Sequence, residues 1–150
     1  MDLLEPEVTP FNAVPLSETL SVTGQICPDD LPAIASAGFK SLICNRPDGE
    51  SPGQFSSQEI ATAAHSVGLS LAYLPVMSGS VRAQDGRDFG DLLKQLPTPV
   101  LAYCRSGTRS ALLWALSQVG STPWPDLVQR AAQAGFNLTS SVPPVPPTRP

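Results

Sequence analysis

The sequence predicts a single α/β domain whose central, mostly parallel sheet is flanked by helices. Short apolar runs alternate along the chain with segments of helical apolar spacing, and turn residues separate the two kinds of segment. Strands and helices that alternate in this way form βαβ units with helices on both faces of the sheet. The 150 residues are 41% hydrophobic and 15% charged, which suits a protein with a buried core and argues against global disorder.

The predicted strands are short apolar runs that end at turn signals. A weakly alternating segment at residues 12–25 indicates one or two opening strands. The later runs, which we expect to be buried strands of the sheet, are residues 40–44, 69–76 and 99–103. The first of these runs stops at Asn45-Arg46-Pro47-Asp48-Gly49, a strong turn signal.

The predicted helices carry recognisable start signals, and several are followed by glycine. Pro28 and the two acids after it suit a first helical turn. Ser56 and Glu59 have the spacing of a capping box, in which each residue satisfies a backbone N–H group near the other. The predicted helices cover residues 28–37, 56–67, 85–96, 110–119 and 124–134. We expect one catalytic domain over residues 1–140, followed by a proline-rich flexible tail at residues 141–150.

Charge and composition exclude several classes of protein. The formal net charge of −4 lacks the basic footprint of a nucleic-acid-binding protein, and no apolar stretch is long enough to span a bilayer. The N-terminus carries acids in place of a signal peptide's basic and apolar segments. Three cysteines without CxxC spacing and a single histidine give neither a disulfide framework nor a zinc site. We therefore expect a cytoplasmic protein without a metal or other cofactor.

The segment from Cys104 to Arg109 is the strongest functional signal in the sequence. A buried strand is predicted to end at Tyr103, and a helix is predicted to begin a few residues after Cys104. A loop that runs from a strand into a helix N-terminus directs backbone N–H groups inward and forms an anion-binding site. Gly107 permits the tight backbone path, and Arg109 adds a planar, permanently charged fork.

This loop favours a negative charge at its centre, where Cys104 lies. A free cysteine titrates near pH ~8.5, and helix N-termini and nearby cations lower that value. We therefore expect Cys104 to be a nucleophilic thiolate and Arg109 to be catalytic with it, although a cysteine after a buried strand is more often a small core residue. The residues expected to bind the substrate anion are Arg105, Ser106, Gly107, Thr108 and Ser110.

Two residues after the strand at 40–44 are weaker candidates for the same site. Arg46 and Asp48 follow the carboxyl end of a strand, on the side where the Cys104 loop is expected. They would then line the pocket or orient Arg109. The alternative is that they serve only the turn around Pro47. Cys44, at the end of the same strand, is either a resolving thiol or a core residue.

The loop resembles the catalytic loops of two families. Cysteine phosphatases have Cys-x5-Arg followed by Ser or Thr, whereas rhodanese-like sulfurtransferases have the shorter Cys-Arg-x-Gly-x-Arg or Thr. Four residues separate Cys104 from Arg109, so the sequence matches the shorter pattern at every fixed position.

A wider resemblance extends from about residue 22 to about residue 138. It is carried by Asn45-Arg46-Pro47-Asp48-Gly49-Glu50 and Tyr103-Cys104-Arg105-Ser106-Gly107-Thr108-Arg109-Ser110, with Gly24-Gln25, Ala37-Gly38-Phe39 and Ala134-Gly135-Phe136-Asn137-Leu138. On these segments the chain resembles the beta-lactamase-hydrolase-like, phosphatase-like domain family, also catalogued as a sulfur transferase family. The resemblance implies a cysteine-phosphatase-like architecture of the dual-specificity type with a rhodanese-like loop.

The sequence favours sulfur transfer over the hydrolysis of phosphate esters. Phosphatases of this fold protonate the leaving oxygen with an acid, usually an aspartate shortly after the strand equivalent to 69–76, and residues 75–80 contain no acid. Asp85 and Asp88 come later, where a capping role is the simpler explanation. A shorter loop also suits a persulfide better than a phosphoryl group. The expected partners are a small anionic sulfur donor and a thiol acceptor.

Two alternatives remain open. In the first, the protein is a phosphatase that acts on a phosphorylated substrate through a phosphocysteine, and arylphosphates turn over best. In the second, it is a non-catalytic module that senses oxyanions or persulfides. Neither alternative involves nucleic acid or membranes.

Overall fold

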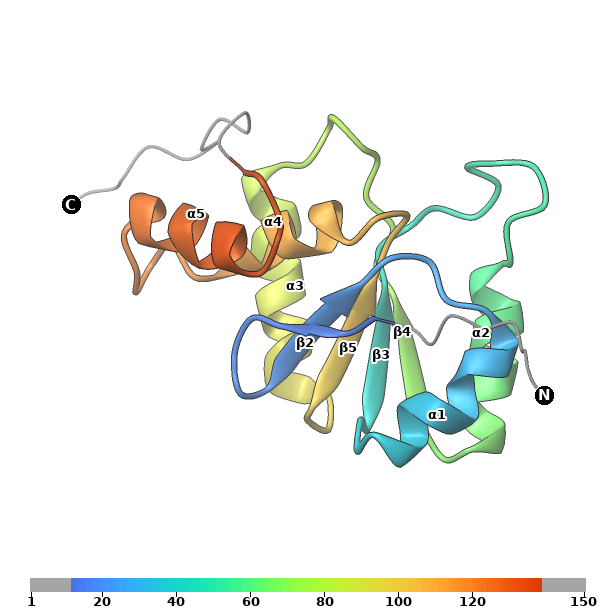
Figure 1. The fold of residues 1–150 in the computed structure, drawn as a ribbon. Coiled ribbons are helices and arrows are strands. Elements are labelled where there is room, and N and C mark those ends of the chain that lie inside the picture. Colours follow the sequence, from blue (N-terminus) through green and yellow to red (C-terminus); the bar gives the residue numbers. More distant parts are fainter. Residues whose placement is uncertain (1–11, 139–150) are drawn as a thin grey trace, which may run out of the picture.

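A five-stranded sheet forms the centre of the computed structural model, which describes residues 12–138 (Figure 1). Its strands are β1 (Val14–Pro15), β2 (Leu20–Thr23), β3 (Ser41–Cys44), β4 (Ser70–Tyr73) and β5 (Val100–Tyr103). Their spatial order is β1-β2-β5-β3-β4; β1 pairs antiparallel with β2, and every other pair is parallel. The predicted α/β class and mostly parallel sheet are confirmed. The tail expected at residues 141–150 lies outside the described residues.

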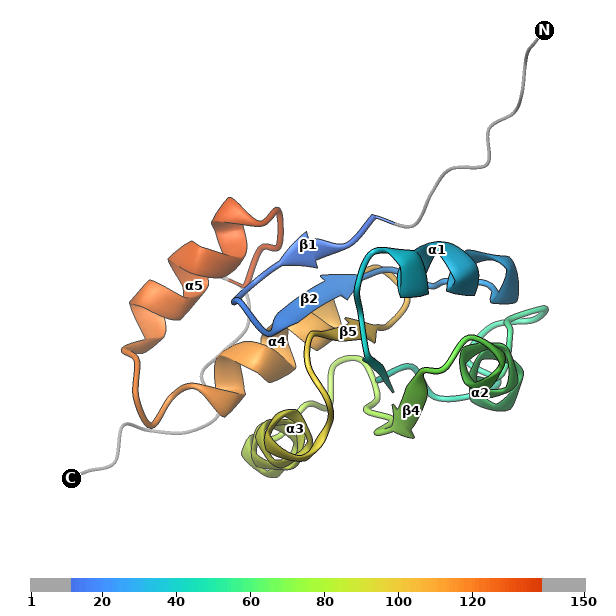
Figure 2. The ribbon, with the colours of Figure 1, turned by 90° about the horizontal axis from the view of Figure 1, so that it is seen from below.

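Helices cover both faces of this sheet (Figure 2). They are a 3₁₀ helix (Pro28–Asp30) that leads into α1 (Leu31–Ser36), then α2 (Ser57–Ser66), α3 (Ala83–Gln95), α4 (Thr108–Ser117) and α5 (Trp124–Gln133). The helices α1 and α2 pack on one face, and α3, α4 and α5 pack on the other. The capping box is confirmed: Glu59 N–H donates to Ser56 Oγ at 3.0 Å, and Ser56 N–H donates to Glu59 Oε1 at 2.8 Å.

The strands are apolar on both sides because each face of the sheet has its own core. On β3, Ile43 belongs to the core with α3–α5, whereas Leu42 belongs to the core with α1 and α2. On β5, Ala102 and Leu101 divide in the same way. Continuous apolar runs of this kind are typical of parallel strands that are buried on both faces.

Several element boundaries differ from the predicted ones, and two of them lie near the Cys104 loop. The strand expected to reach residue 76 ends at Tyr73, because the carbonyl of the next residue, Leu74, accepts from the Asn45 side chain (Nδ2, 3.0 Å) and not from a backbone N–H group. The chain nevertheless stays beside β3, since Val76 N–H donates to the carbonyl of Asn45 at 3.0 Å. The helix expected from residue 110 begins two residues earlier, at Thr108, directly after Gly107 at the N-cap.

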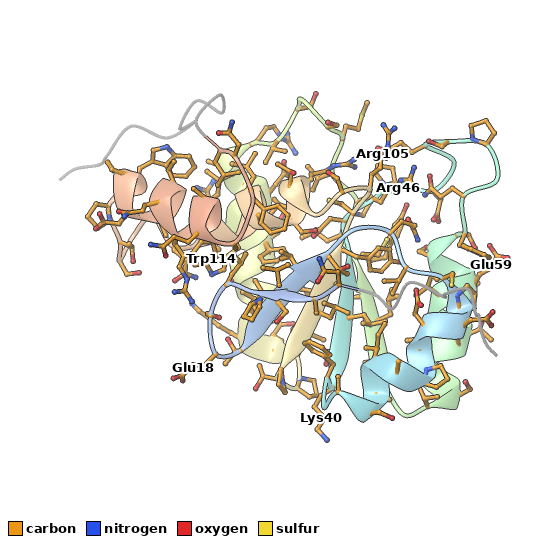
Figure 3. All side chains as sticks on the ribbon, viewed as in Figure 1. Glu18, Lys40, Arg46, Glu59, Arg105 and Trp114 are labelled. Atoms are coloured by element: carbon orange, nitrogen blue, oxygen red, sulfur yellow. The ribbon has the colours of Figure 1, made fainter. Side chains whose placement is uncertain are left out.

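The loops after β2, β3, β4 and β5 lie at one end of the sheet, where the parallel strands have their carboxyl ends (Figure 1). Arg46 and Arg105 project at this end, whereas Lys40 lies at the opposite end (Figure 3). In open α/β sheets, ligands bind beyond the carboxyl ends of the strands. Within residues 12–138, none of the helices has the length and apolar character required to cross a bilayer.

Candidate active site

The loop between β5 and α4 is built around the sulfur of Cys104. Cys104 follows β5 directly, and Gly107 has φ +96°, a left-handed conformation that glycine adopts without strain. The Gly107 N–H group donates to Cys104 Sγ at 3.1 Å. The sulfur therefore accepts a backbone hydrogen bond directly before the first turn of α4.

A cavity of about 890 Å³ lies above this loop. Its lining comes from the loop itself, from Glu50, from the segment before α3 and from the first turns of α4: Glu50, Ser78, Gly79, Val81, Cys104, Arg105, Ser106, Thr108, Arg109 and Leu112. The structure therefore brings together in one cavity five of the expected site residues, which are Cys104, Arg105, Ser106, Thr108 and Arg109. Gly107 is buried behind them.

Arg109 is held at one edge of its guanidinium group and leaves the other edge open. Its Nη1 donates to Glu50 Oε2 at 3.0 Å and to the carbonyl of Val76 at 2.9 Å, and its Nη2 donates to Glu50 Oε1 at 3.2 Å. A guanidinium carries five N–H bonds, so the Nε–H bond and one Nη2–H bond remain. The Arg109 side chain is only 8% exposed, and its Nε atom has no partner among the described residues.

This open edge is suited to an oxyanion. The Nε and Nη2 atoms present two nearly parallel N–H bonds, which match two oxygen atoms of a phosphoryl or similar group. A buried donor without a partner is costly, and a bound anion would satisfy it. Cys104 and Arg109 line the same cavity, so an anion bound there lies next to both residues.

Glu50 belongs to the site, although it was not among the residues expected there. Its carboxylate bonds to Arg109 and, through Oε1, to Arg46 Nε at 2.8 Å. The hydrogen bond from Arg109 is the largest of the effects that lower the pKa of Glu50, with Arg46 contributing in the same direction. Glu50 is therefore ionised at neutral pH and does not donate a proton. Glu50 ends the Asn45–Glu50 segment that carries the family resemblance, and this is the sequence signal that could have identified it.

Arg46 lies behind the cavity and does not line it. Its side chain is 6% exposed and bonds to Gln25 Oε1, Glu50 Oε1 and Ser51 Oγ, at 3.0, 2.8 and 3.0 Å. The sequence suggested that Arg46 lines the pocket, orients Arg109 or serves only the turn. These contacts correspond to orienting Arg109, because Glu50 bonds to both arginines.

Two other expected binding residues make contacts away from the cavity. The carboxylate of Asp48 accepts hydrogen bonds from the backbone and the hydroxyl of Ser57, at 2.7 and 2.9 Å, and so holds the start of α2. Ser110 is fully buried and donates to Asn45 Oδ1 at 2.8 Å. Both residues support the loops around the site without lining it.

The acids after β4 are engaged in local contacts of α3. The carboxylate of Asp85 accepts from Arg82 N–H at 2.8 Å, and Asp88 accepts from Gln84 Nε2 at 2.8 Å. Neither acid lines the cavity. Among the described residues, Glu50 is thus the one carboxylate in the cavity wall.

Cys44 is placed poorly for a resolving thiol. It packs with Tyr103 in the core beside α1 and α2 and does not line the cavity that Cys104 lines. Burial raises the pKa of the Cys44 thiol, which donates to the carbonyl of Arg46 at 3.3 Å. Within residues 12–138, no three side chains of the His, Cys, Asp and Glu types gather as a metal site.

Replacing Gly107 with alanine is expected to damage both folding and the site. An alanine Cβ would lie 2.8 Å from Phe136 Cε1, in a backbone conformation that L-residues rarely adopt. We expect a loss of about 1–3 kcal/mol in the free energy of unfolding and at least a ~tenfold drop in the alkylation rate of Cys104. Chemical denaturation and iodoacetamide labelling measure the two effects.

The matched control for this variant is Gly38→Ala. Gly38 has a similar φ of +101° but no atom within 4 Å of an added Cβ. It precedes β3, at the end of the sheet opposite to the Cys104 loop. It should lose stability through the backbone alone and leave the labelling rate unchanged. Equal labelling rates in both variants would contradict the placement of Gly107 N–H on the sulfur.

Comparison with known proteins gives a consistent family and fold. The family model for the beta-lactamase hydrolase-like protein, phosphatase-like domain, matches residues 13–121. The beta-lactamase hydrolase-like protein of Agrobacterium fabrum is 33% identical over 133 residues, which are 87% of this chain and 31% of that protein. The chain thus spans about a third of the length of this relative.

Solved structures with the same fold are described as phosphatases. A "putative phosphatase" from Neisseria meningitidis superposes with a TM-score of 0.78 at 35% identity, covering 85% of this chain and 91% of the other. Kinase associated phosphatase superposes with a TM-score of 0.70 at 16% identity, covering 89% and 90% of the two chains. The second likeness establishes only the fold.

Proposed function

Since this chain belongs to the beta-lactamase hydrolase-like, phosphatase-like domain family, we propose that it is a cysteine-dependent phosphatase that hydrolyses phosphomonoesters through a phosphocysteine. The observation that carries the proposal is the buried edge of the Arg109 guanidinium that has no hydrogen-bond partner among the described residues. Arg109 lines the same cavity as Cys104. The phosphatase descriptions of the structural neighbours support it. They favour phosphatase chemistry over the sulfur transfer that the loop length and the lack of an acid at residues 75–80 had favoured.

Binding of the phosphoryl group would use donors that are already in place. Two of its oxygens accept from Nε and Nη2 of Arg109, and others accept from the first N–H groups of α4, which have no partner within the helix. Glu50 and the carbonyl of Val76 keep the guanidinium in this orientation before substrate arrives. Such preorganised donors stabilise charge in the transition state without reorganising.

The covalent steps follow from this arrangement. The Cys104 thiolate attacks phosphorus, an S–P bond forms, and the bond from phosphorus to the ester oxygen breaks, so that the leaving group departs with the electron pair. A water molecule then attacks the phosphocysteine, releases inorganic phosphate and returns the thiolate. Gly107 N–H, at 3.1 Å from Sγ, stabilises the sulfur both as nucleophile and as leaving group.

The cavity wall narrows the choice of leaving group. Its one carboxylate among the described residues, Glu50, is ionised by its two arginine partners and has no proton to give. The leaving oxygen must therefore depart as an anion or take its proton from water. Esters of acidic alcohols, such as phenols, satisfy this requirement.

Sulfur transfer is the second candidate, favoured by the same lack of a proton donor and by the Cys-x4-Arg loop. In this reaction the Cys104 thiolate attacks the outer sulfur of a donor such as thiosulfate, an S–S bond forms, and sulfite leaves. A thiol acceptor then takes the outer sulfur from the Cys104 persulfide. Sulfite is a good leaving group, so this reaction also proceeds without a general acid.

A paired assay on one preparation tests the proposal. We expect turnover of nitrophenyl phosphate, and a kcat lower by roughly 10²–10⁴-fold for an alkyl phosphate, because a general acid normally supplies about that factor. Thiosulfate with cyanide, and glutathione persulfide with a thiol, are assayed beside it. Turnover of the sulfur donors without turnover of nitrophenyl phosphate would replace the proposal by the second candidate. A single labelling of Cys104 without turnover of either substrate would indicate the non-catalytic module.

A further inference from the structure

The Cys104 loop is contacted from outside by the residues that follow β2. Gln25 N–H donates to the carbonyl of Arg105 at 3.1 Å. Because the C=O and N–H of a trans peptide point in opposite directions, the N–H group of Ser106 points away from Gln25. A Cβ on Gly24 would lie 3.0 Å from the same carbonyl, so a larger residue there would press on the loop backbone. The beginning of the Cys104 loop is thus held by the backbone of Gly24 and Gln25.

The side chain of Gln25 connects to the other end of the loop through Arg46 and Glu50. Its Oε1 accepts from Arg46 Nη1 at 3.0 Å, and its Nε2 donates to the carbonyl of Ile26 at 2.8 Å, so both ends of the amide are engaged. Arg46 Nε donates to Glu50 Oε1 at 2.8 Å, and Glu50 holds Arg109. A chain of hydrogen bonds therefore runs from Arg105 through Gln25, Arg46 and Glu50 to Arg109.

We propose that Gln25 is a positioning residue that keeps the Arg109 fork in register with the backbone donors of the Cys104 loop. It contacts neither the cavity nor the sulfur and acts through Arg46 and Glu50. Arg46 is 6% exposed, so removal of its Gln25 acceptor leaves a buried donor unpaired. The guanidinium then seeks another acceptor, and the Glu50 carboxylate that orients Arg109 moves with it. The inference rests on the proposed oxyanion site and not on whether phosphorus or sulfur is transferred.

The test compares Gln25→Met, which keeps the length of the side chain but removes the acceptor, with Gln25→Glu, which restores an acceptor for Arg46. Inorganic phosphate is the probe: it should protect Cys104 from alkylation by iodoacetamide, followed by mass spectrometry of the Cys104 peptide. Gln118→Met is the matched control, because Gln118 bonds to Ser117 and does not line the Cys104 cavity. Thermal unfolding is measured for each protein.

We expect Gln25→Met to need about tenfold more phosphate for half-protection, the effect of losing one hydrogen bond to a charged group. The alkylation rate without phosphate should stay within about twofold, because the Gly107 contact to the sulfur is untouched. Gln25→Glu should return half-protection to within about threefold of the unaltered protein.

Three results would overturn the inference. Unchanged half-protection in Gln25→Met would show that Arg109 does not depend on Gln25. A parallel loss of protection and of the basal alkylation rate, with a lower unfolding temperature than Gln118→Met, would indicate general loosening of the loop. Failure of phosphate to protect the unaltered protein would remove the oxyanion site itself, and the proposed function with it.

Discussion

Replacing Cys104 with serine is expected to abolish turnover, with kcat falling at least about 10⁴-fold. The serine hydroxyl is not ionised at neutral pH, and no described residue of the cavity wall is placed as a base for it: Glu50 bonds to two arginines. The fold should survive, because the side chains have similar size and the hydroxyl can still accept from Gly107 N–H. Steady-state kinetics on nitrophenyl phosphate measure the loss.

Cys27→Ser is the control for this experiment. Cys27 is half-buried at the start of the first helical turn and does not line the cavity, so its variant should retain full activity. Mass spectrometry of the rapidly quenched enzyme adds a direct reading: one phosphoryl group on Cys104 supports the phosphatase, and one extra sulfur atom supports the persulfide route. Turnover that survives Cys104→Ser would show that this cysteine is not the nucleophile.

Replacing Arg109 with lysine is the second change with a large expected effect. Lysine keeps the positive charge but cannot present two parallel N–H bonds, and it cannot bond to Glu50, to Val76 and to substrate together. We expect kcat/KM to fall by about 10²–10³-fold, or about 3–4 kcal/mol of transition-state stabilisation. Most of the loss should be in kcat if the Arg109 guanidinium binds the phosphoryl group more tightly in the transition state than in the ground state.

Arg87→Lys is the matched control, since Arg87 lies exposed on α3 and bonds to Gln84. This variant should have the kinetics of the unaltered enzyme. An Arg109→Lys enzyme within about threefold of the unaltered kcat/KM would show that charge alone is sufficient, contrary to the bidentate geometry.

The network around Arg109 also explains how an acidic chain holds an anion. The formal net charge is −4, yet Arg46, Glu50 and Arg109 together carry one positive charge at the cavity, and exposed Arg105 adds a second at its rim. The carboxylate of Glu50 holds the side chains of Arg46 and Arg109 in place and leaves one edge of the Arg109 guanidinium without a partner. The positive potential is local and directed, which is what recognition of a small oxyanion requires.

Local sequence signals were sufficient for the fold class and for the position of the loop. The capping box at Ser56 and Glu59 is a contact within one helical turn, so spacing alone predicts it. Cys104 and Arg109 lie in one short segment between a strand and a helix, and a segment of that length has few ways to arrange them. The end of β4 was predicted too late, because apolar character continues to Val76 although the carbonyl of Leu74 bonds to the Asn45 side chain and not to a backbone N–H group.

By itself, then, the sequence determined a mostly parallel α/β sheet and a thiol at the start of a helix, because both follow from periodicity and from neighbours along the chain. The tertiary structure alone decided which edge of Arg109 is paired, that Glu50 and Gln25 serve the same loop, and that Asp48 bonds to Ser57 instead. Those contacts join residues as far apart as Gln25 and Arg105. Their partners are selected by how strands from distant parts of the chain pair, and no spacing in the sequence records that pairing.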